Sequence, residues 1–314
     1  MAKPFLHEHH EFKDLLQIVS EKEAIPEFLV GKDYWIMHCL YGLQGLGLDF
    51  ELKGGTSLSK GFKLIHRFSE DIDIRINPPK EQSIPIGKNQ TKPAQCKKRL
   101  EFYDWLSDEI KIPGITETQR DTQFDDSKYW SGGVRLIYPS QFLHLSGIKE
   151  GILLEVGFDN VTPNIPTDIS SWAFDFAFEK VLLKDNRARG IKCYHPAYTL
   201  VEKLQAISTK YRKYMEGINL PPNFMRHYYD LYCLLEDEEV QKSIGSEAYQ
   251  EHKEKRFPKA DNKCIAANEA FIISNSAIRE TMKEAYQASA SLYYKGQPDF
   301  EVILECINKH KNHL

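Results

Sequence analysis

The chain has 314 residues, of which 41% are hydrophobic, 12% aromatic and 27% charged. This length allows one large domain or two modest ones, and the composition is that of an ordinary globular protein, which excludes disordered, collagen-like and small disulfide-stapled classes. The formal net charge of -4 disfavours a protein that coats nucleic acid.

The sequence favours a cytoplasmic protein that does not enter a membrane. Its longest apolar runs fall far short of the ~20 residues that a membrane span needs. The N-terminus lacks the cationic, apolar and small-residue order of a secretory signal. Six scattered cysteines with no Cys-x-x-Cys spacing favour reduced thiols over a zinc site or a disulfide framework.

The first part of the chain mixes helix and strand signals. Apolar residues recur at helical spacing in residues 12–19 and 34–46. Residues 50–76 then change to a strand, a glycine turn, a short helical stretch and a second strand. The further predicted elements are a helix at 100–110, strands at 134–138 and 152–158, and a proline-bounded loop at 162–166.

After Pro196 the pattern becomes helical throughout. Helical spacing occupies residues 199–214, 224–236 and much of 262–310, and no convincing strand pattern remains. We therefore predict two domains, a mixed α+β domain over residues 1–195 and a helical domain over residues 196–314.

The clearest chemical signal lies in the predicted strand that contains Asp71, Asp73 and Arg75. A period of two places these three residues on one face and isoleucines on the other. Two carboxylates side by side repel each other and are costly to desolvate unless a cation or solvent compensates them. The pattern indicates a divalent metal site, and the alternative is the solvated face of an edge strand.

A glycine turn shortly before these aspartates suits a phosphate. Gly54 and Gly55 let the backbone approach an anion closely. The N–H groups of a helix start, together with the hydroxyls of Thr56 and Ser57, could hold a phosphate there. The turn and the aspartates would then grip opposite sides of one triphosphate.

A third carboxylate comes from the strand at residues 152–158. Glu155 is the charged exception in this apolar run. Magnesium binds through a few acidic oxygens, substrate phosphates and water, so Glu155 would complete its coordination. The alternative is a glutamate that lies at a sheet edge or in an ion pair.

These segments resemble one known family. Gly-Gly-Thr-Ser-Leu at residues 54–58, followed by Arg-Phe-Ser-Glu-Asp-Ile-Asp at 67–73, closely resembles the first motif of the AbiEii/AbiGii toxin family, a branch of the nucleotidyltransferase superfamily related in fold to polymerase beta. Residues 202–206 resemble its lysine-bearing helix, and residues 226–232 resemble its Arg-x-x-x-Asp-Leu motif. His227 and a proline-containing insertion after Ile76 depart from the family pattern.

The resemblance implies a nucleotidyltransferase-type mixed sheet flanked by helices, followed by a helical bundle. It also implies metal-dependent transfer of a nucleoside monophosphate from an NTP, with pyrophosphate leaving. The metal, Mg²⁺ or Mn²⁺, would be bound by Asp71, Asp73 and Glu155, with Glu155 near the attacking hydroxyl. The implied nucleotide-binding residues are Gly54, Gly55, Thr56, Ser57, Arg67, Ser69, Lys203 and Arg226, and the implied catalytic residues are Asp71, Asp73, Glu155, Lys203 and Asp230.

Helical geometry by itself places Lys203 at the margin of an apolar stripe, where its stem can be buried while its ammonium reaches a phosphate. The same geometry is also that of an ordinary amphipathic lysine. The resemblance favours the first interpretation.

The acceptor is the least determined part of the prediction. Residues 180–213 contain nine basic and two acidic residues with interleaved tyrosines, a pattern that suits RNA, such as a tRNA, as well as it suits a solvated basic surface. The resemblance implies the toxin of a toxin–antitoxin or phage-defence module, and hence an antitoxin partner. Transfer to a protein or a small molecule, and a non-catalytic nucleotide-binding module, stay open as alternatives.

Overall fold

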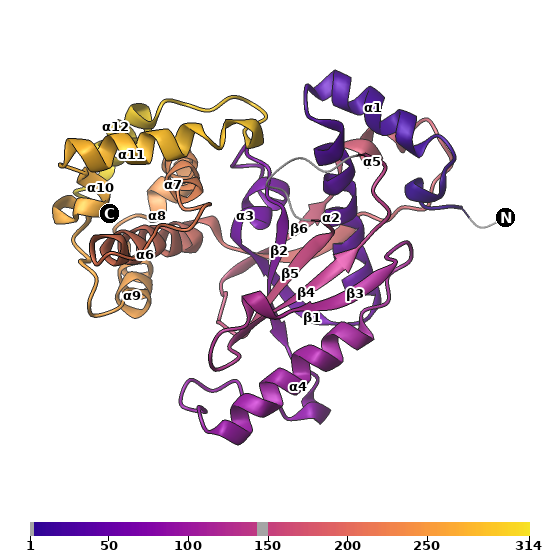
Figure 1. Ribbon diagram of the computed structural model, residues 1–314, viewed down its shortest axis with the longest axis horizontal. Helices are drawn as coiled ribbons and strands as arrows, with labels where there is room; N and C mark the ends of the chain where they lie inside the picture. Colours follow the sequence, from indigo (N-terminus) through magenta and orange to yellow (C-terminus); the bar gives the residue numbers. More distant parts are fainter. Residues whose placement is uncertain (1–2, 143–149) are drawn as a thin grey trace. The chain divides into compact units, whose positions relative to one another are not determined.

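The structure is a computed structural model that describes residues 3–142 and 150–314 (Figure 1). The chain divides into two compact units. The first comprises Met1–Gly61 and Ser69–Tyr194, and the second comprises Phe62–Phe68 and His195–Leu314. The short segment Phe62–Phe68 therefore belongs with the C-terminal helices, although it lies between two strands of the first unit.

In the described part of the first unit, seven strands form one mixed sheet in the order β3-β4-β5-β2-β1-β7-β6. The pairs β2–β5 and β1–β7 are parallel, and the other neighbours are antiparallel. The strands are β1 (Asp49–Lys53), β2 (Asp71–Asn77), β3 (Glu117–Asp121), β4 (Ser131–Ile137), β5 (Ile152–Gly157), β6 (Asn164–Ile169) and β7 (Ala188–Tyr194).

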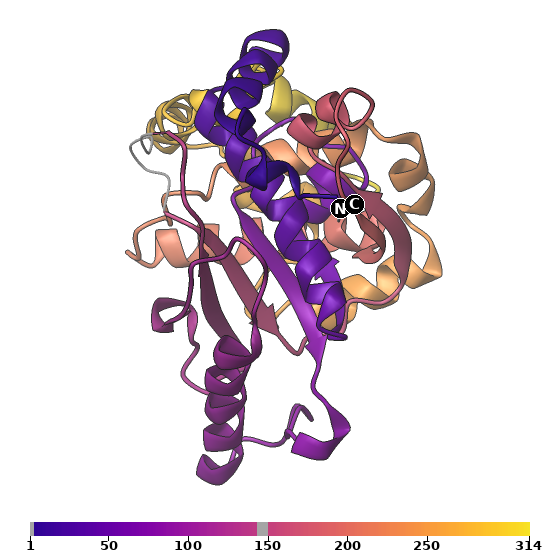
Figure 2. The ribbon, with the colours of Figure 1, turned by 90° about the vertical axis from the view of Figure 1, so that its right-hand side faces the viewer.

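One face of this sheet is apolar and is covered by two helices, α2 (Glu27–Gly45) and α4 (Pro93–Glu109) (Figures 1 and 2). The isoleucines of β2 are buried on this face. Trp35 of α2 stacks on Tyr138 with ring centroids 4.9 Å apart. The ring of Tyr103 in α4 lies so close to Gly132 that a Cβ there would meet it at 2.7 Å. Close packing on this face leaves the opposite face to the polar residues of the same strands.

Two further helices pack beside α2 in the first unit. They are α1 (Phe12–Glu23) and α5 (Trp172–Ala177). The glycine turn after β1 continues as a short helical segment, α3 (Gly54–Thr56) followed by a π-helical turn over Ser57–Gly61. The buried Asp33 of α2 anchors that turn, since its carboxylate lies 2.6 Å from the Lys60 ammonium.

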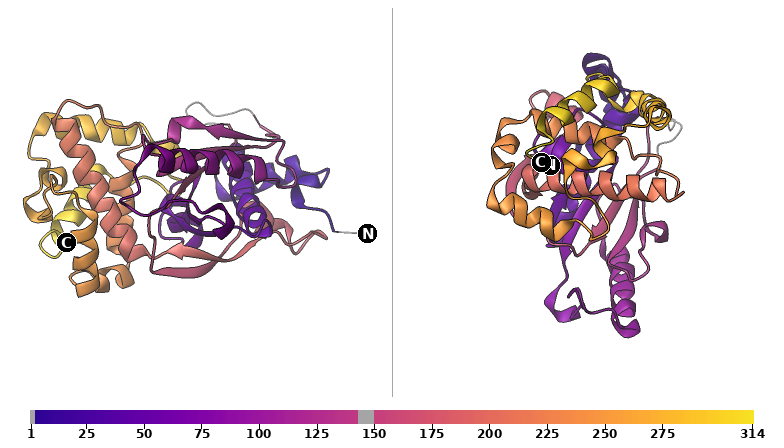
Figure 3. Two further views of the ribbon diagram at one scale, coloured as in Figure 1. Left: turned by 90° about the horizontal axis from the view of Figure 1, so that it is seen from below. Right: turned by 90° about the vertical axis from the view of Figure 1, so that its left-hand side faces the viewer.

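Helices make up most of the second unit in its described residues, and Arg67 of the segment Phe62–Phe68 forms an isolated β-bridge with Tyr293 (Figure 3). Its helices are α6 (Pro196–Met215), α7 (Arg226–Glu236), α8 (Glu238–Ser243), α9 (Glu247–Arg256), α10 (Glu269–Ile272), α11 (Ser276–Gln287) and α12 (Phe300–His310). Pro196 fills the first position of α6, where no N–H partner is needed, and the His195 ring accepts from the N–H of Ala197. Tyr228 of α7 packs against Phe300 of α12, with centroids 5.5 Å apart. Each helix described in residues 3–142 and 150–314 is too short or too polar to cross a membrane.

The fold confirms the predicted class, a mixed sheet flanked by helices and followed by a helical region, but three strands were not predicted. The proline-bounded loop expected at residues 162–166 is wrong in its second half, because β6 begins at Asn164. Strands β3 and β7 were also missed. Edge strand β3 reads Glu-Thr-Gln-Arg-Asp and buries little, and β7 alternates only partly between buried and exposed residues. Neither carries a clear period of two.

Candidate active site

Strand register places the predicted acidic residues on one face of the sheet. Asp73 lies opposite Glu155 in the parallel pair β2–β5, and Lys53 lies opposite Asp73 in the pair β1–β2. Residues directly opposite each other, and residues two apart on one strand, share a face. The structure thus brings Glu155 beside Asp73, with Asp71 two positions away on the same face. No three His, Cys, Asp or Glu side chains of the described residues already adopt the arrangement of a metal site.

The electrostatics of Asp71 reflect this crowding. Burial, and then the nearby charges of Asp73 and Glu70, raise the pKa of the Asp71 carboxyl to about 6. The cations Lys32 and Arg135 act in the opposite direction. A carboxyl in this state gains from any additional positive charge. The chemistry of the donor set therefore fits a divalent cation.

The glycine turn closes tightly over the acidic strand. Gly54 has a φ of +72°, and a Cβ at this position would lie 2.2 Å from Oδ2 of Asp73. Both the backbone conformation and the close approach therefore require glycine. The turn leaves its backbone directly beside an aspartate of the acidic set.

The hydroxyls of Thr56 and Ser57 already have acceptors within the chain. Thr56 donates to the carbonyl of Asp71, and Ser57 donates to the carbonyl of Gly54 at 2.9 Å. Both residues are fully buried. The Thr56 hydroxyl fixes the turn against β2, and the Ser57 hydroxyl forms its bond within the turn. Ser69 is half-buried two residues before Asp71.

In the second unit, Arg67, Lys203 and Asp230 form a buried ion cluster. Arg67 donates to both oxygens of Asp230, from Nε at 2.6 Å and from Nη2 at 2.7 Å. The Lys203 ammonium lies 2.7 Å from Oδ2 of the same carboxylate. Asp230 is fully buried, and 8% of Lys203 and 5% of Arg67 are exposed. Burial by itself would raise the pKa of Asp230, but the charges and hydrogen bonds of Arg67 and Lys203 outweigh it and hold that pKa well below its usual range.

The contacts of Asp230 bear on its predicted role as a catalytic residue. Both oxygens of Asp230 are taken by cations, which suits a residue that orients Arg67 and Lys203 rather than one that meets substrate. Arg226 is half-buried at the start of α7. Next to it, Nε2 of His227 lies 2.8 Å from the Lys210 ammonium, and burial together with the charges of Lys203 and Lys210 keeps the pKa of His227 well below its usual value. His227 is therefore neutral in a cationic neighbourhood.

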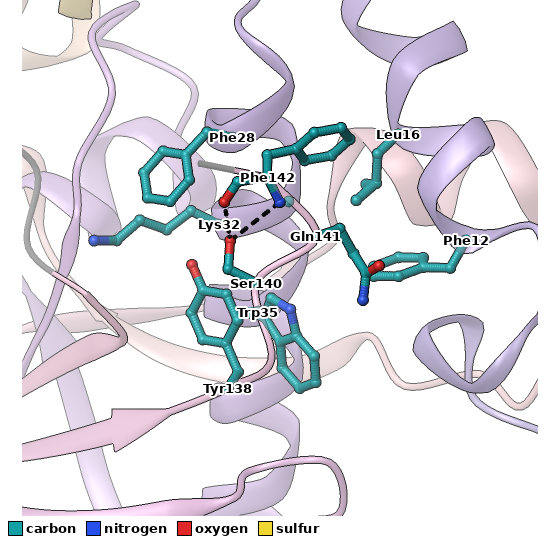
Figure 4. A pocket seen from close by; sticks show the side chains of 10 residues that line it. Phe12, Leu16, Phe28, Lys32, Trp35, Tyr138, Ser140, Gln141 and Phe142 are labelled. Carbon is teal, nitrogen blue, oxygen red and sulfur yellow. Dashed lines mark hydrogen bonds between the residues drawn. The ribbon is translucent and has the colours of Figure 1, made fainter. Parts of the chain in front are cut away.

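Lys32, a buried cation beside the acidic strand, was not predicted from the sequence. Lys32 is 1% exposed, and its ammonium lies 3.8 Å from Oε2 of Glu70, the residue before Asp71. Burial lowers the pKa of Lys32, and the charges of Glu70 and Asp71 oppose that shift. Figure 4 shows its stem near the rings of Phe28 and Tyr138, with the ammonium pointing away from Phe12. The signal in the sequence was a lysine within the mostly apolar stretch of residues 28–40.

A first prediction concerns Asp71 and stability. Because the pKa of Asp71 is raised in the folded state, the folded state binds more protons than the unfolded state between about pH 4 and pH 6, and stability falls as the pH rises through that window. Asp71→Asn should therefore stabilise the metal-free protein at pH 7.5 by roughly 3 kcal/mol, and much less at pH 4. Thermal unfolding in EDTA at both pH values measures this. Asp108→Asn, at an exposed position of α4, is the control, and an equal gain at both pH values would contradict the account.

A second prediction concerns Lys32. Lys32→Met removes a positive charge that favours ionised Asp71, so the stabilisation that Asp71→Asn gives at pH 7.5 should be larger in the Lys32→Met background than in the parent. A double-mutant cycle from chemical denaturation measures the difference. Lys32→Arg keeps the charge and should leave the effect of Asp71→Asn close to its parental value. If the changes in the free energy of unfolding from Asp71→Asn and Lys32→Met simply add, the two residues are not coupled.

A third prediction concerns the ion cluster of the second unit. Asp230→Asn leaves two buried cations without their counter-ion and should destabilise the protein by about 3 kcal/mol or more. Urea unfolding monitored by circular dichroism gives the value. Glu280→Gln removes an exposed carboxylate of α11 that pairs with Lys283 and should cost less than about 1 kcal/mol. Similar losses in both variants would speak against a special role of the cluster.

The chain is similar to known nucleotidyltransferase toxins. The chain matches the family model of the nucleotidyl transferase AbiEii toxin of type IV toxin–antitoxin systems over residues 36–306. Among solved structures it is similar to MenT4, a nucleotidyltransferase toxin from Mycobacterium tuberculosis H37Rv, at 14% identity and a TM-score of 0.42, over 94% of this chain and 95% of that chain. No curated protein matches the chain by sequence. Since the family match spans most of its length, the chain belongs to the AbiEii family of nucleotidyltransferase toxins.

Proposed function

We propose that this toxin transfers a nucleoside monophosphate from an NTP to an RNA acceptor, with a divalent cation, Mg²⁺ or Mn²⁺, held by Asp71, Asp73 and Glu155. The observation that carries the proposal is the register of β2 and β5, which sets Glu155 directly beside Asp73. The raised pKa of Asp71 supports it, because burial and the neighbouring charges of Asp73 and Glu70 leave that carboxyl short of positive charge.

Each group of this chain then has a distinct task. The N–H groups of the turn at Gly54 and Gly55 bind phosphate oxygens, and the buried hydroxyl of Thr56 fixes that turn on β2. The bound cation would neutralise triphosphate charge and make the acceptor hydroxyl easier to ionise. Glu155 orients the attacking hydroxyl. Ser69 supports the acidic strand that begins two residues later.

The cations of the second unit would serve the phosphates. Lys203 and Arg67 are held in fixed positions by the carboxylate of Asp230, so neither has to be ordered when a nucleotide binds. We assign phosphate binding to Lys203 and Arg226, and a positioning role to Arg67 and Asp230.

The basic segment at residues 180–213 gives less support to an RNA acceptor than its composition suggested. Several of its cations are paired with acids inside the chain: Arg187 with Asp185, Arg189 with Asp168 and Asp185, Lys192 with Asp49, Lys203 with Asp230, and Arg212 with Asp261 and Glu216. Paired cations attract phosphate weakly. This segment therefore supports an RNA acceptor only weakly, and labelled transfer decides between RNA and the other acceptors.

A toxin of this family also implies a partner that restrains it. We propose an antitoxin encoded with it. The non-catalytic alternative, a nucleotide-binding module, would leave the close pairing of Asp73 and Glu155 without a task.

Labelled transfer is the direct test. The protein is incubated with each of the four α-³²P-labelled NTPs, Mg²⁺ and total RNA or lysate, and the label should appear on RNA. Asp73→Asn and Glu155→Gln should each lower the rate at least about a hundredfold, because each removes a carboxylate that would hold the cation that neutralises the reacting phosphate, whereas Asp108→Asn should leave it unchanged. Label found only on protein or on small molecules would reject RNA as acceptor, and growth inhibition that survives Asp73→Asn would reject catalysis as the toxic activity.

A further inference from the structure

A cavity in the first unit lies beside Glu155. Its volume is about 250 Å³, and it is bordered by the end of β5, the start of β4, the loop before β4, and Lys53. Its lining includes the side chains of Lys53, Asp126, Trp130, Glu155 and Asp159. The volume is slightly below the roughly 300 Å³ of typical small-molecule pockets, so the cavity suits a single ring system with its sugar rather than an extended chain.

The position of the cavity relative to the glycine turn determines which of the two substrates the cavity can bind. Lys53, Asp73 and Glu155 form one row across three strands. Beyond this row in one direction, the chain enters the glycine turn, where Thr56 is bonded to Asp71. In the other direction lie Gly157 and Ser131, which face each other at the cavity. The turn and the cavity therefore lie on opposite sides of the carboxylate row.

In-line phosphoryl transfer requires this separation. The attacking and leaving oxygens lie roughly opposite each other on the transferred phosphorus. With the leaving phosphates at the glycine turn, the attacking hydroxyl has to approach from the side of Gly157 and Ser131. The cavity thus lies on the acceptor side and not on the side of the leaving pyrophosphate.

The lining chemistry favours a nucleoside over a phosphate. Three acidic residues, Asp126, Glu155 and Asp159, border the cavity together with one lysine. Carboxylates accept hydrogen bonds from hydroxyl and amino groups and repel phosphate. A ribose and a base amino group supply such donors.

Trp130 lies at the edge of the cavity, where neighbouring residues hold its ring in place. The guanidinium carbon of Arg99 lies 3.9 Å from the centre of a Trp130 ring. Arg99 is fully buried, and it donates to the carbonyls of Lys128, Pro85 and Gln90 at 2.8 to 3.0 Å. The backbone N–H of Trp130 donates to Asp126. A buried arginine with these bonds holds the indole in one place, so a stacked base would meet a surface that is already ordered.

We propose that this cavity binds the terminal nucleoside of the RNA acceptor, with its base stacked on Trp130 and its ribose hydroxyls directed toward Glu155. The inference rests on the proposed nucleotidyltransfer to RNA and adds the acceptor subsite. Trp130 is a specificity residue for the acceptor and has no part in NTP binding.

Binding and transfer are measured separately to test this. Binding of a single-stranded RNA hexamer is followed by tryptophan fluorescence without NTP, in the parent, Trp130→Ala and Trp130→Phe. The hexamer should quench the tryptophan fluorescence of the parent protein. The Kd of the hexamer, from fluorescence anisotropy, should rise about tenfold in Trp130→Ala and much less in Trp130→Phe, which keeps a ring. Trp105→Phe, a tryptophan of α4 outside the cavity, is the matched control.

In the transfer assay, Trp130→Ala should raise the KM for RNA while the KM for NTP stays at the parental value. An unchanged hexamer Kd in Trp130→Ala, or a KM for NTP that rises instead, would overturn the proposal. Label on protein with no hexamer binding would also overturn it, in favour of a peptide acceptor. If no acceptor is labelled but the hexamer still binds through Trp130, the proposed function fails while the subsite stands.

Discussion

Electrostatic crowding on one face of the sheet is the constraint from which the rest of the site follows. Asp71, Asp73 and Glu155 share that face because the parallel pair β2–β5 keeps them in register. Burial and the nearby charges of Asp73 and Glu70 raise the pKa of Asp71, so the ionised form of that carboxyl is in an unfavourable environment. Such strain at a site is the expected cost of a function that supplies positive charge later.

The surrounding chain limits that cost through Lys32, which reaches from α2 to Glu70 and keeps part of the charge compensated. The glycine turn comes so near Asp73 that a Cβ at Gly54 would overlap its carboxylate. The second unit has the opposite balance of charge, because the single carboxylate of Asp230 holds two cations in place.

The sequence predicts the alternating acidic strand well and its surroundings poorly. A period of two was enough to place Asp71 and Asp73 on one face, and a lone charge in an apolar run was enough to single out Glu155. The register that sets Glu155 against Asp73 arises from long-range pairing, which no local pattern encodes. For the same reason the sequence could not show that Arg67 pairs with Asp230, 163 residues away, or that Arg99 braces Trp130. Nor could it show that the hydroxyls of Thr56 and Ser57 are used within the turn.

The central claim is that Asp71, Asp73 and Glu155 together bind one divalent cation. Electron paramagnetic resonance of Mn²⁺, titrated into the protein with a non-hydrolysable NTP analogue, tests it without relying on turnover. We predict a tightly bound Mn²⁺ in the parent and in Asp108→Asn, and weak or no binding in Asp73→Asn and Glu155→Gln. Equal Mn²⁺ affinity in the parent and in Glu155→Gln would contradict the account, because the third carboxylate would then have no part in the metal site.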